Sequence, residues 1–133
     1  MLPRPADLVR IEEELRQAFN GTPGRFRPFA EYFPNTDRIE VHTKDCSTLE
    51  ETPDHCAPLV LIKDHYRGGY VGFAIAFAVP YCAENGLVSD GMVSLGNVLD
   101  TIERKIPGMK GPCAIARRIV MKHDFSMVAL TAS

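Results

Sequence analysis

The sequence has no excess of charge of one sign and no long apolar run. Its 15 Lys and Arg face 17 Asp and Glu, and the net charge of −2 argues against binding nucleic acid or anionic membranes through positive charge. The longest stretch without a charged residue, Gly68–Ala83, contains Pro80 and is shorter than the ~20 apolar residues of a membrane-spanning helix. The first twenty residues hold no apolar signal-peptide core. We therefore expect no membrane partner and no sequence-specific nucleic-acid partner.

Cysteine is sparse as well. The four cysteines are widely and irregularly spaced: Cys46, Cys56, Cys82 and Cys113. A chain of 133 residues can build a hydrophobic core without disulfides, and without a signal peptide we expect a reducing cytosol. The sequence therefore predicts free thiols, with Cys82 and Cys113 as small buried hydrophobic residues.

Catalytic signatures are also missing. The sequence contains no GxSxG nucleophile elbow, no GxGxxG and no phosphate-binding loop. Asp64 and His65 are neighbours at the end of a predicted strand, where adjacent side chains point to opposite faces, so they do not form a catalytic dyad. We predict a hairpin end there, and we expect neither an enzyme nor a cofactor.

A metal site is the first chemical candidate. The segment between residues 42 and 56 contains two histidines and two cysteines, all of zinc-ligand type: His42, Cys46, His55 and Cys56. Their spacing is not that of a known zinc motif, and an adjacent His-Cys pair rarely ligates one ion. The alternative is a polar loop with unliganded side chains, and a zinc-dependent enzyme is the corresponding functional alternative.

A second zinc pattern is incomplete. Cys82-Ala83-Glu84 and Pro112-Cys113 look similar to the cysteine and glutamate motifs of cytidine deaminases. Position 116 is Ala where that family has its next zinc-binding cysteine, so one ligand is missing. We interpret the similarity as coincidence.

What the sequence does contain favours one folded domain spanning residues 1–133. Hydrophobic residues make up 45% and charged residues 24%. Apolar residues at 3,4 spacing predict two amphipathic helices, over residues 5–19 and 92–106. Asn20-Gly21 ends the first helix, and a loop over residues 20–38 follows, with a short extended piece near residues 25–30.

The strands are predicted from alternation and turn residues. They comprise a strand at 39–43, a hairpin over 58–79 that turns at Gly68-Gly69, and a closing hairpin over 113–131, with a long loop over 44–57. The predicted fold class is α+β: an antiparallel sheet of about four to five strands with two amphipathic helices packed on one face. The helices are expected to pack on the large residues of the second hairpin strand: Val71, Phe73, Ile75, Phe77 and Val79.

Two interaction surfaces are predicted. The even positions of that strand are small, and either a second layer of the same chain or another subunit lies against them: Gly72, Ala74, Ala76 and Ala78. The stretch 25–33 is rich in residues that are enriched at protein interfaces: Arg25, Phe26, Arg27, Phe29 and Tyr32. These residues either bind a partner or cover the edge of the sheet.

The order of elements carries a resemblance to a known family. The relevant segments are Pro5–Phe19, Phe33-Pro34, the hairpin Leu59–Val79, the helix Val93–Ile106 and the hairpin Ala114–Leu130. With them, the chain resembles the tail-terminator and tail-completion proteins of tailed bacteriophages and related prophage particles. The loop over 44–57 departs from that pattern.

The resemblance implies a non-enzymatic structural protein. It implies a homo-oligomeric ring, hexameric in that family, which caps the tail tube at the neck and contacts tail-tube and neck proteins. It places the chain in the host cytoplasm during assembly and then in the virion tail. A mildly acidic chain suits a ring through which DNA slides, and three acidic residues are candidates for the lumen, or else part of a solvated loop: Glu50, Glu51 and Asp54.

A different class of function fits the same composition. A small cytosolic inhibitor or adaptor would bind one protein partner as a monomer, through the stretch 25–33.

Overall fold

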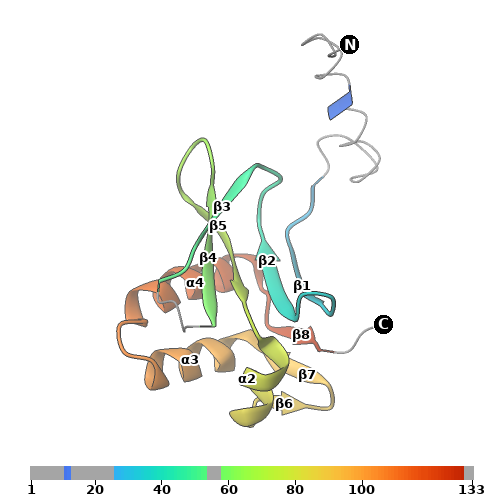
Figure 1. The fold of residues 1–133 in the computed structure, drawn as a ribbon, viewed down its shortest axis with the longest axis vertical. Helices are drawn as coiled ribbons and strands as arrows, with labels where there is room; N and C mark the ends of the chain where they lie inside the picture. Colours follow the sequence, from blue (N-terminus) through green and yellow to red (C-terminus); the bar gives the residue numbers. More distant parts are fainter. Residues whose placement is uncertain (1–10, 13–25, 54–57, 131–133) are drawn as a thin grey trace.

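A five-stranded antiparallel sheet and three helices form the body of the protein (Figure 1). The computed structural model describes residues 11–12, 26–53 and 58–130. The predicted α+β class is confirmed, and the sheet has the upper of the two predicted strand numbers. Of the predicted helix 5–19 only Ile11 and Glu12 are described, and both are helical.

The sheet has the order β1-β2-β5-β4-β3. The strands are β1 Phe29–Phe33, β2 Arg38–His42, β3 Thr48–Glu51, β4 Leu59–Asp64 and β5 Tyr70–Ile75. Strands β3, β4 and β5 form a meander, and β2 lies beside β5 although it connects to β3, which is a Greek-key arrangement. The connection over residues 43–47 therefore crosses from β2 to the far edge of the sheet, past the turn between β4 and β5.

One face of the sheet forms the main core. Ile39, Ile75 and Leu59 lie side by side across β2, β5 and β4, and all are fully buried. Two helices cover this face, α3 Leu95–Lys105 and α4 Lys110–His123, with buried residues at helical spacing: Leu95, Val98, Leu99, Ile102, Cys113 and Ala116. A short helix, α2 Ala78–Glu84, closes one end of the core with Ala78 and Cys82. Burial raises the pKa of the Cys82 thiol to about 11.

The opposite face of the sheet has a smaller apolar centre. Val60, Ile62 and Ala74 are buried there, with Val71 and Ala76 packed against them. The Arg38 guanidinium on β2 reaches Glu50 on β3, with an N–O distance of 3.0 Å, and so spans the two strands between them. The small side chains of β5 leave room for this ion pair to cross the sheet.

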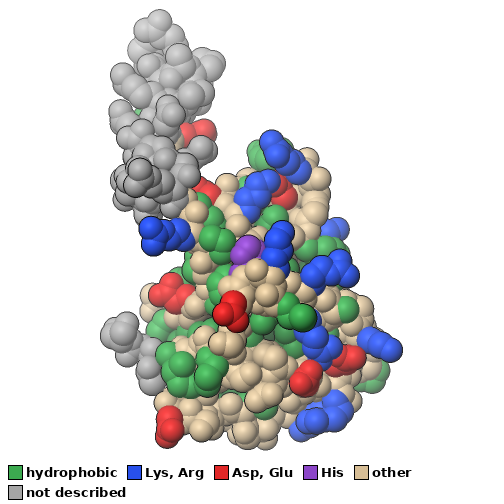
Figure 2. All heavy atoms as spheres, turned by 180° about the vertical axis from the view of Figure 1, so that it is seen from behind, with side chains coloured by type: hydrophobic (Ala, Val, Ile, Leu, Met, Phe, Trp, Pro, Cys, Tyr) green, Lys and Arg blue, Asp and Glu red, His purple; other side chains and the backbone are tan. Residues whose placement is uncertain are grey.

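The outer surface of the helical layer is basic. Helices α3 and α4 carry six Lys and Arg residues but only Asp100 and Glu103 as acidic ones, and Arg117 contacts both carboxylates. Figure 2 shows the Lys and Arg side chains spread over this face. The exposed ones are Arg104, Lys105, Lys110, Arg118 and Lys122. The net charge of −2 therefore conceals a basic layer behind the sheet.

The predicted closing hairpin over 113–131 is wrong. Residues 110–123 form the helix α4, and only Met127–Ala129 form a strand, β8. Pro112 stands in the first turn of α4, where a missing N–H costs no helical hydrogen bond. The partial alternation at 113–121 was a misleading signal, because the residues that face the core follow a helical spacing instead.

Three other boundaries differ from the prediction. Strand β5 ends at Ile75 and not at residue 79, since Phe77 turns the chain into α2. The predicted loop 44–57 contains strand β3. The predicted helix 92–106 begins at Leu95, because Met92–Ser94 forms strand β7 between β8 and the short strand β6, Val88–Ser89.

Candidate functional site

The turn between β4 and β5 is organised around one carboxylate. Asp64 is only 5% exposed, and its Oδ1 accepts hydrogen bonds from the backbone N–H of Tyr66 at 3.0 Å and of Arg67 at 3.1 Å. Its Oδ2 accepts one from Lys44 Nζ at 2.8 Å. The Lys44 ammonium and the two backbone N–H groups hold the pKa of Asp64 well below its usual range. The carboxylate is therefore charged at neutral pH and fixes the turn.

The segment that crosses the end of the sheet is tied to the same turn. His65 N–H donates to Ser47 O at 2.7 Å, and the Thr43 hydroxyl donates to Val71 O at 2.7 Å. Together with the ion pair between Lys44 and Asp64, these bonds join the crossing segment to the β4–β5 hairpin. Residues 44–57 were predicted to form a long loop, yet the crossing segment is anchored at several points.

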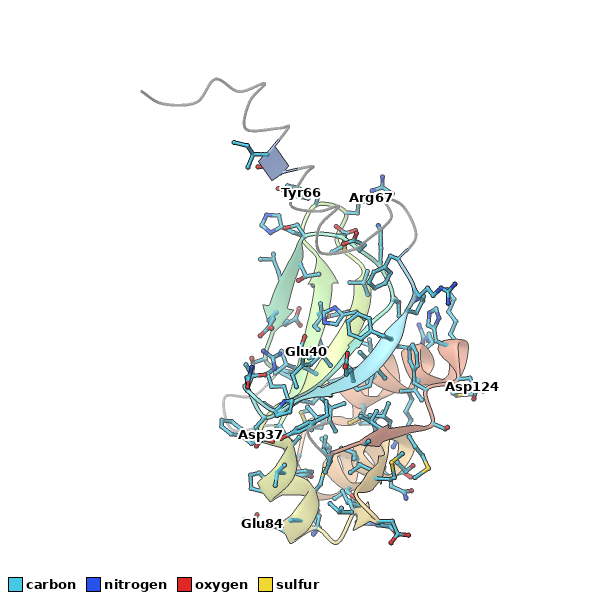
Figure 3. All side chains as sticks on the ribbon, turned by 90° about the vertical axis from the view of Figure 1, so that its right-hand side faces the viewer. Asp37, Glu40, Tyr66, Arg67, Glu84 and Asp124 are labelled. Atoms are coloured by element: carbon cyan, nitrogen blue, oxygen red, sulfur yellow. The ribbon has the colours of Figure 1, made fainter. Side chains whose placement is uncertain are left out.

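The hairpin tip, residues 65–69, presents two large side chains to solvent. Tyr66 is 82% exposed and Arg67 is exposed next to it, while the His65 ring lies 4.7 Å from the Tyr66 ring. Gly68 and Gly69 adopt positive φ angles that close the turn. Figure 3 shows Tyr66 and Arg67 at one extremity of the sheet. A tyrosine and an arginine on a fixed turn form the kind of anchor found at the centre of protein interfaces.

A cavity of about 510 Å³ lies beside the tip. Its lining is polar: Glu12, Lys44, Cys46, Ser47, Asp64, Tyr66 and Arg67. Burial and the neighbouring Asp64 carboxylate raise the pKa of the Cys46 thiol, so that at neutral pH this thiol is protonated and a poor nucleophile.

The other end of the sheet carries a strained aromatic residue. Phe77 has φ 52° and ψ 45°, a left-handed conformation that is unfavourable for a residue with a Cβ. Its side chain is nevertheless 71% exposed, so core packing does not compensate for the strain. Val79, two residues on, is 43% exposed. Strained backbone that displays an apolar side chain is typical of a contact surface.

Asp37, from the turn between β1 and β2, holds this conformation. Its backbone O accepts the Ala78 N–H at 3.1 Å, and its Oδ1 accepts the Val79 N–H at 3.0 Å. The Tyr32 hydroxyl also donates to Oδ1, at 2.8 Å. Asp37 thus satisfies the first N–H groups of α2 from a distant part of the chain, and Figure 3 shows it beside the start of that helix.

A small apolar pocket, the α2 pocket, opens next to Phe77. It has a volume of about 220 Å³ and is lined by Pro58, Phe77, Pro80, Tyr81, Glu84 and Ile106. The Tyr81 hydroxyl is buried and has no hydrogen-bond partner among the described residues. The pocket therefore combines apolar walls with one carboxylate, that of Glu84.

We expect Asp37→Ala to lower the free energy of unfolding by about 1–2 kcal/mol, because it removes the cap of α2 and places Ala at a φ of 49°. Asp37→Asn is the matched control, since Asn keeps the side-chain oxygen and tolerates the left-handed region. Its effect should stay within about 0.5 kcal/mol in urea unfolding. Equal losses for both variants would contradict the capping role.

The residues predicted as interface lie on different faces. Phe26 and Phe29 form an aromatic group with Phe33 and His42 on the outer face of β1 and β2, with Phe29 5.2 Å from the His42 ring. Arg27 is exposed nearby. Tyr32 points to the other face, toward Asp37, and Arg25 lies outside the described residues.

The predicted stripe of small residues is also divided. Ala74 is buried and Ala76 half-buried on the outer side of the sheet, whereas Ala78 is buried in the main core as part of α2. The even-position pattern ends where β5 ends.

The lumen candidates are partly paired. Glu50 and Glu51 lie on β3, where Glu50 contacts Arg38 and Glu51 contacts Lys63 at 3.1 Å. Asp54 lies outside the described residues. Both described carboxylates are exposed at the edge of the sheet.

The metal candidates are placed as follows. His42 Nε2 is 2.8 Å from Glu40 Oε1, Cys46 lines the cavity at the tip, and His55 and Cys56 lie outside the described residues. Within residues 26–53 and 58–130, no three His, Cys, Asp or Glu side chains are placed to hold a metal ion. Cys46, Cys82 and Cys113 are free thiols.

Sequence reasoning missed Phe77, Asp37 and the α2 pocket. The run around Phe77 alternates like a strand, and only contact with Asp37, forty residues earlier, turns it into a helix start. The tip gave a clearer signal, because Gly68-Gly69 marks a turn and Tyr66-Arg67 precede it.

Compared with protein-family models, with curated proteins and with solved structures, the chain matches none of them. No helix in the described part of the chain has the length and apolar character needed to cross a bilayer.

Proposed function

We propose that this chain is a non-enzymatic structural protein that assembles with copies of itself into a ring, as a tail terminator does at the neck of a phage or phage-like particle. The observation that supports it most is Phe77, an exposed aromatic residue on left-handed backbone beside an apolar pocket. The exposed Phe77 side chain and its strained backbone both raise the free energy of the isolated subunit. A contact with another protein would bury the side chain.

The α+β fold class supports the same proposal, although one of the elements in the resemblance differs. Helix α4 occupies the place of the closing hairpin, which had carried part of the resemblance to tail terminators. In a ring through which DNA passes, the sheet layer with Glu50 and Glu51 suits the lumen better than the basic helical layer, because a basic lumen would retain the phosphates.

Native mass spectrometry of the full chain tests the proposal. We expect a discrete oligomer of six copies of the 14.8 kDa chain, alone or together with the tail-tube protein. Phe77→Asn should weaken that oligomer without lowering the thermal stability of the subunit, since Asn tolerates left-handed backbone. Met121→Gln is the matched control, because Met121 on α4 is also exposed and should not affect assembly. Monomer alone under both conditions would overturn the proposal.

A second candidate is an inhibitor or adaptor that binds one partner as a monomer. The aromatic group formed by Phe26 with Phe29 and Phe33 of the edge strand β1 favours it. It predicts that wild-type protein stays monomeric and that Arg27→Ala weakens a one-to-one complex.

A further inference from the structure

The hairpin tip and the α2 pocket lie at opposite ends of the same sheet. Figure 3 shows Tyr66 and Arg67 at one extremity and Glu84 of α2 at the other. A projection at one end and a depression at the other permit copies of a chain to join head to tail. Such a contact is heterologous, and it produces a closed ring when the rotation between neighbours closes.

We infer that the Tyr66–Arg67 tip of one copy inserts into the α2 pocket of a second copy. This inference rests on the proposed self-assembly and names the contact that carries it. The Tyr66 ring would fill the apolar space between Phe77, Pro80 and Ile106 of the second copy, and Arg67 would pair with Glu84.

The size of the pocket favours a side chain over a metabolite. Small-molecule sites usually have about 300–1,000 Å³. The α2 pocket has about 220 Å³, so it accepts one aromatic ring. An exposed tyrosine is such a ring, and Tyr66 is the most exposed large hydrophobic residue described.

The chemistry of the pocket fits both residues of the tip. The apolar walls formed by Phe77, Pro80 and Ile106 suit the aromatic ring of Tyr66. Glu84 is exposed at the rim, where the Arg67 guanidinium can reach it. Arg67 and Glu84, both exposed, would each gain an ion-pair partner from the other copy.

The tip is also held in place before any contact forms. The Asp64 carboxylate fixes the backbone N–H groups of Tyr66 and Arg67 themselves. A turn that is already ordered loses less conformational entropy when it binds, so a small contact gains affinity.

Charge exchange between tip and pocket tests the inference. Arg67→Glu and Glu84→Arg each place like charges at the contact, and each protein alone should dissociate with a dissociation constant raised about 30-fold or more. Mixed in equal amounts, they should assemble again, because every tip then meets a pocket of opposite charge. Sedimentation velocity and native mass spectrometry would show an oligomer in which the two variants alternate.

Two further variants complete the experiment. Tyr66→Ala should dissociate the assembly like the charge variants. Arg118→Glu is the control, because Arg118 is an exposed arginine on α4, away from both ends, and should leave the mass unchanged.

The outcomes separate the two claims. If wild type forms the oligomer but the charge variants and their mixture behave as wild type, the tip-to-pocket contact is wrong and self-assembly stands. If each variant dissociates and the mixture stays dissociated, the pairing of Arg67 with Glu84 is wrong. Wild-type protein that is monomeric both alone and with the tail-tube protein overturns both claims.

Discussion

Gly72→Ala is expected to be among the most destabilising single substitutions in the described part of the protein. Gly72 lies opposite His42 in the pairing of β2 with β5. A Cβ at this position would stand 2.0 Å from the Val41 carbonyl oxygen and 3.1 Å from its carbon. Both are backbone atoms of the neighbouring strand, so no side chain can move aside. The added methyl group must push the two strands apart.

The position of Gly72 explains why the backbones approach so closely. The pairing of β4 with β5 shifts register between Ile62 and Lys63, which leaves Val71 as an extra residue in β5. Thr43 binds the Val71 carbonyl oxygen through both its N–H and its hydroxyl, and this draws the end of β2 against the bulge. A glycine beside such a bulge allows the contact.

We expect Gly72→Ala to lower the free energy of unfolding by about 3 kcal/mol or more. The pairing of β2 with β5 is what joins strands β1 and β2 to the rest of the sheet, and the substitution disrupts that pairing. Urea unfolding followed by circular dichroism measures it. Gly111→Ala is the control, because a Cβ at Gly111 meets nothing within 4 Å and Ala favours the helix α4. Gly111→Ala should be neutral or stabilising by up to about 1 kcal/mol. If Gly72→Ala unfolded at the same urea concentration as wild type, β2 and β5 would not approach each other this closely.

The fold class was predictable because its signals are local. The apolar run Leu59–Ile62, the alternation of large and small residues at Phe73–Ile75 and the glycines at 68 and 69 identify a hairpin without knowledge of the rest of the chain. Leu95–Ile102 likewise shows a helical period. For α4 the same signal was present, since Cys113 and Ala116 are three residues apart, but the partial alternation over 113–121 favoured a strand.

The candidate site was less predictable because it depends on distant contacts. Phe77 ends β5 only because Asp37 supplies the cap of α2, and neither residue shows this in its own neighbourhood. Asp64 was interpreted as one residue of a hairpin end, but the ion pair with Lys44, twenty residues earlier, makes it the centre of the tip. Net charge was similarly uninformative, because a total of −2 does not reveal that Lys and Arg gather on the helical layer.

Asp64→Asn is expected to destabilise the protein at neutral pH and to change how stability depends on pH. Asparagine keeps an oxygen that can accept the Tyr66 and Arg67 N–H groups, but it removes the charge that faces Lys44. The variant should therefore unfold at a lower urea concentration than wild type at pH 7, and the tip should lose its tie to the crossing segment.

The sign of the pH effect follows from the direction of the pKa shift. Lys44 and the backbone N–H groups lower the pKa of Asp64 in the folded state below that of an unfolded Asp, which is about 4. The folded state then binds this proton less readily than the unfolded state, so the contribution of Asp64 is complete above about pH 4 and is lost as the pH falls toward the folded pKa. The difference between wild type and Asp64→Asn should be constant from about pH 7 to 5 and should narrow below about pH 4.

Urea unfolding at intervals from pH 7 to pH 2.5 measures this difference directly. Glu31→Gln is the control, because it removes an exposed carboxylate on β1 and should leave the pH profile parallel to that of wild type. Lys44→Met should reduce the destabilisation that Asp64→Asn causes, because the charge partner is already gone. If Asp64→Asn remained equally destabilising at every pH, the loss of stability would not come from the Asp64 charge, and its ion pair with Lys44 would contribute nothing to the order of the tip. In that case the tip would still present Tyr66 and Arg67, but its order would not depend on Lys44.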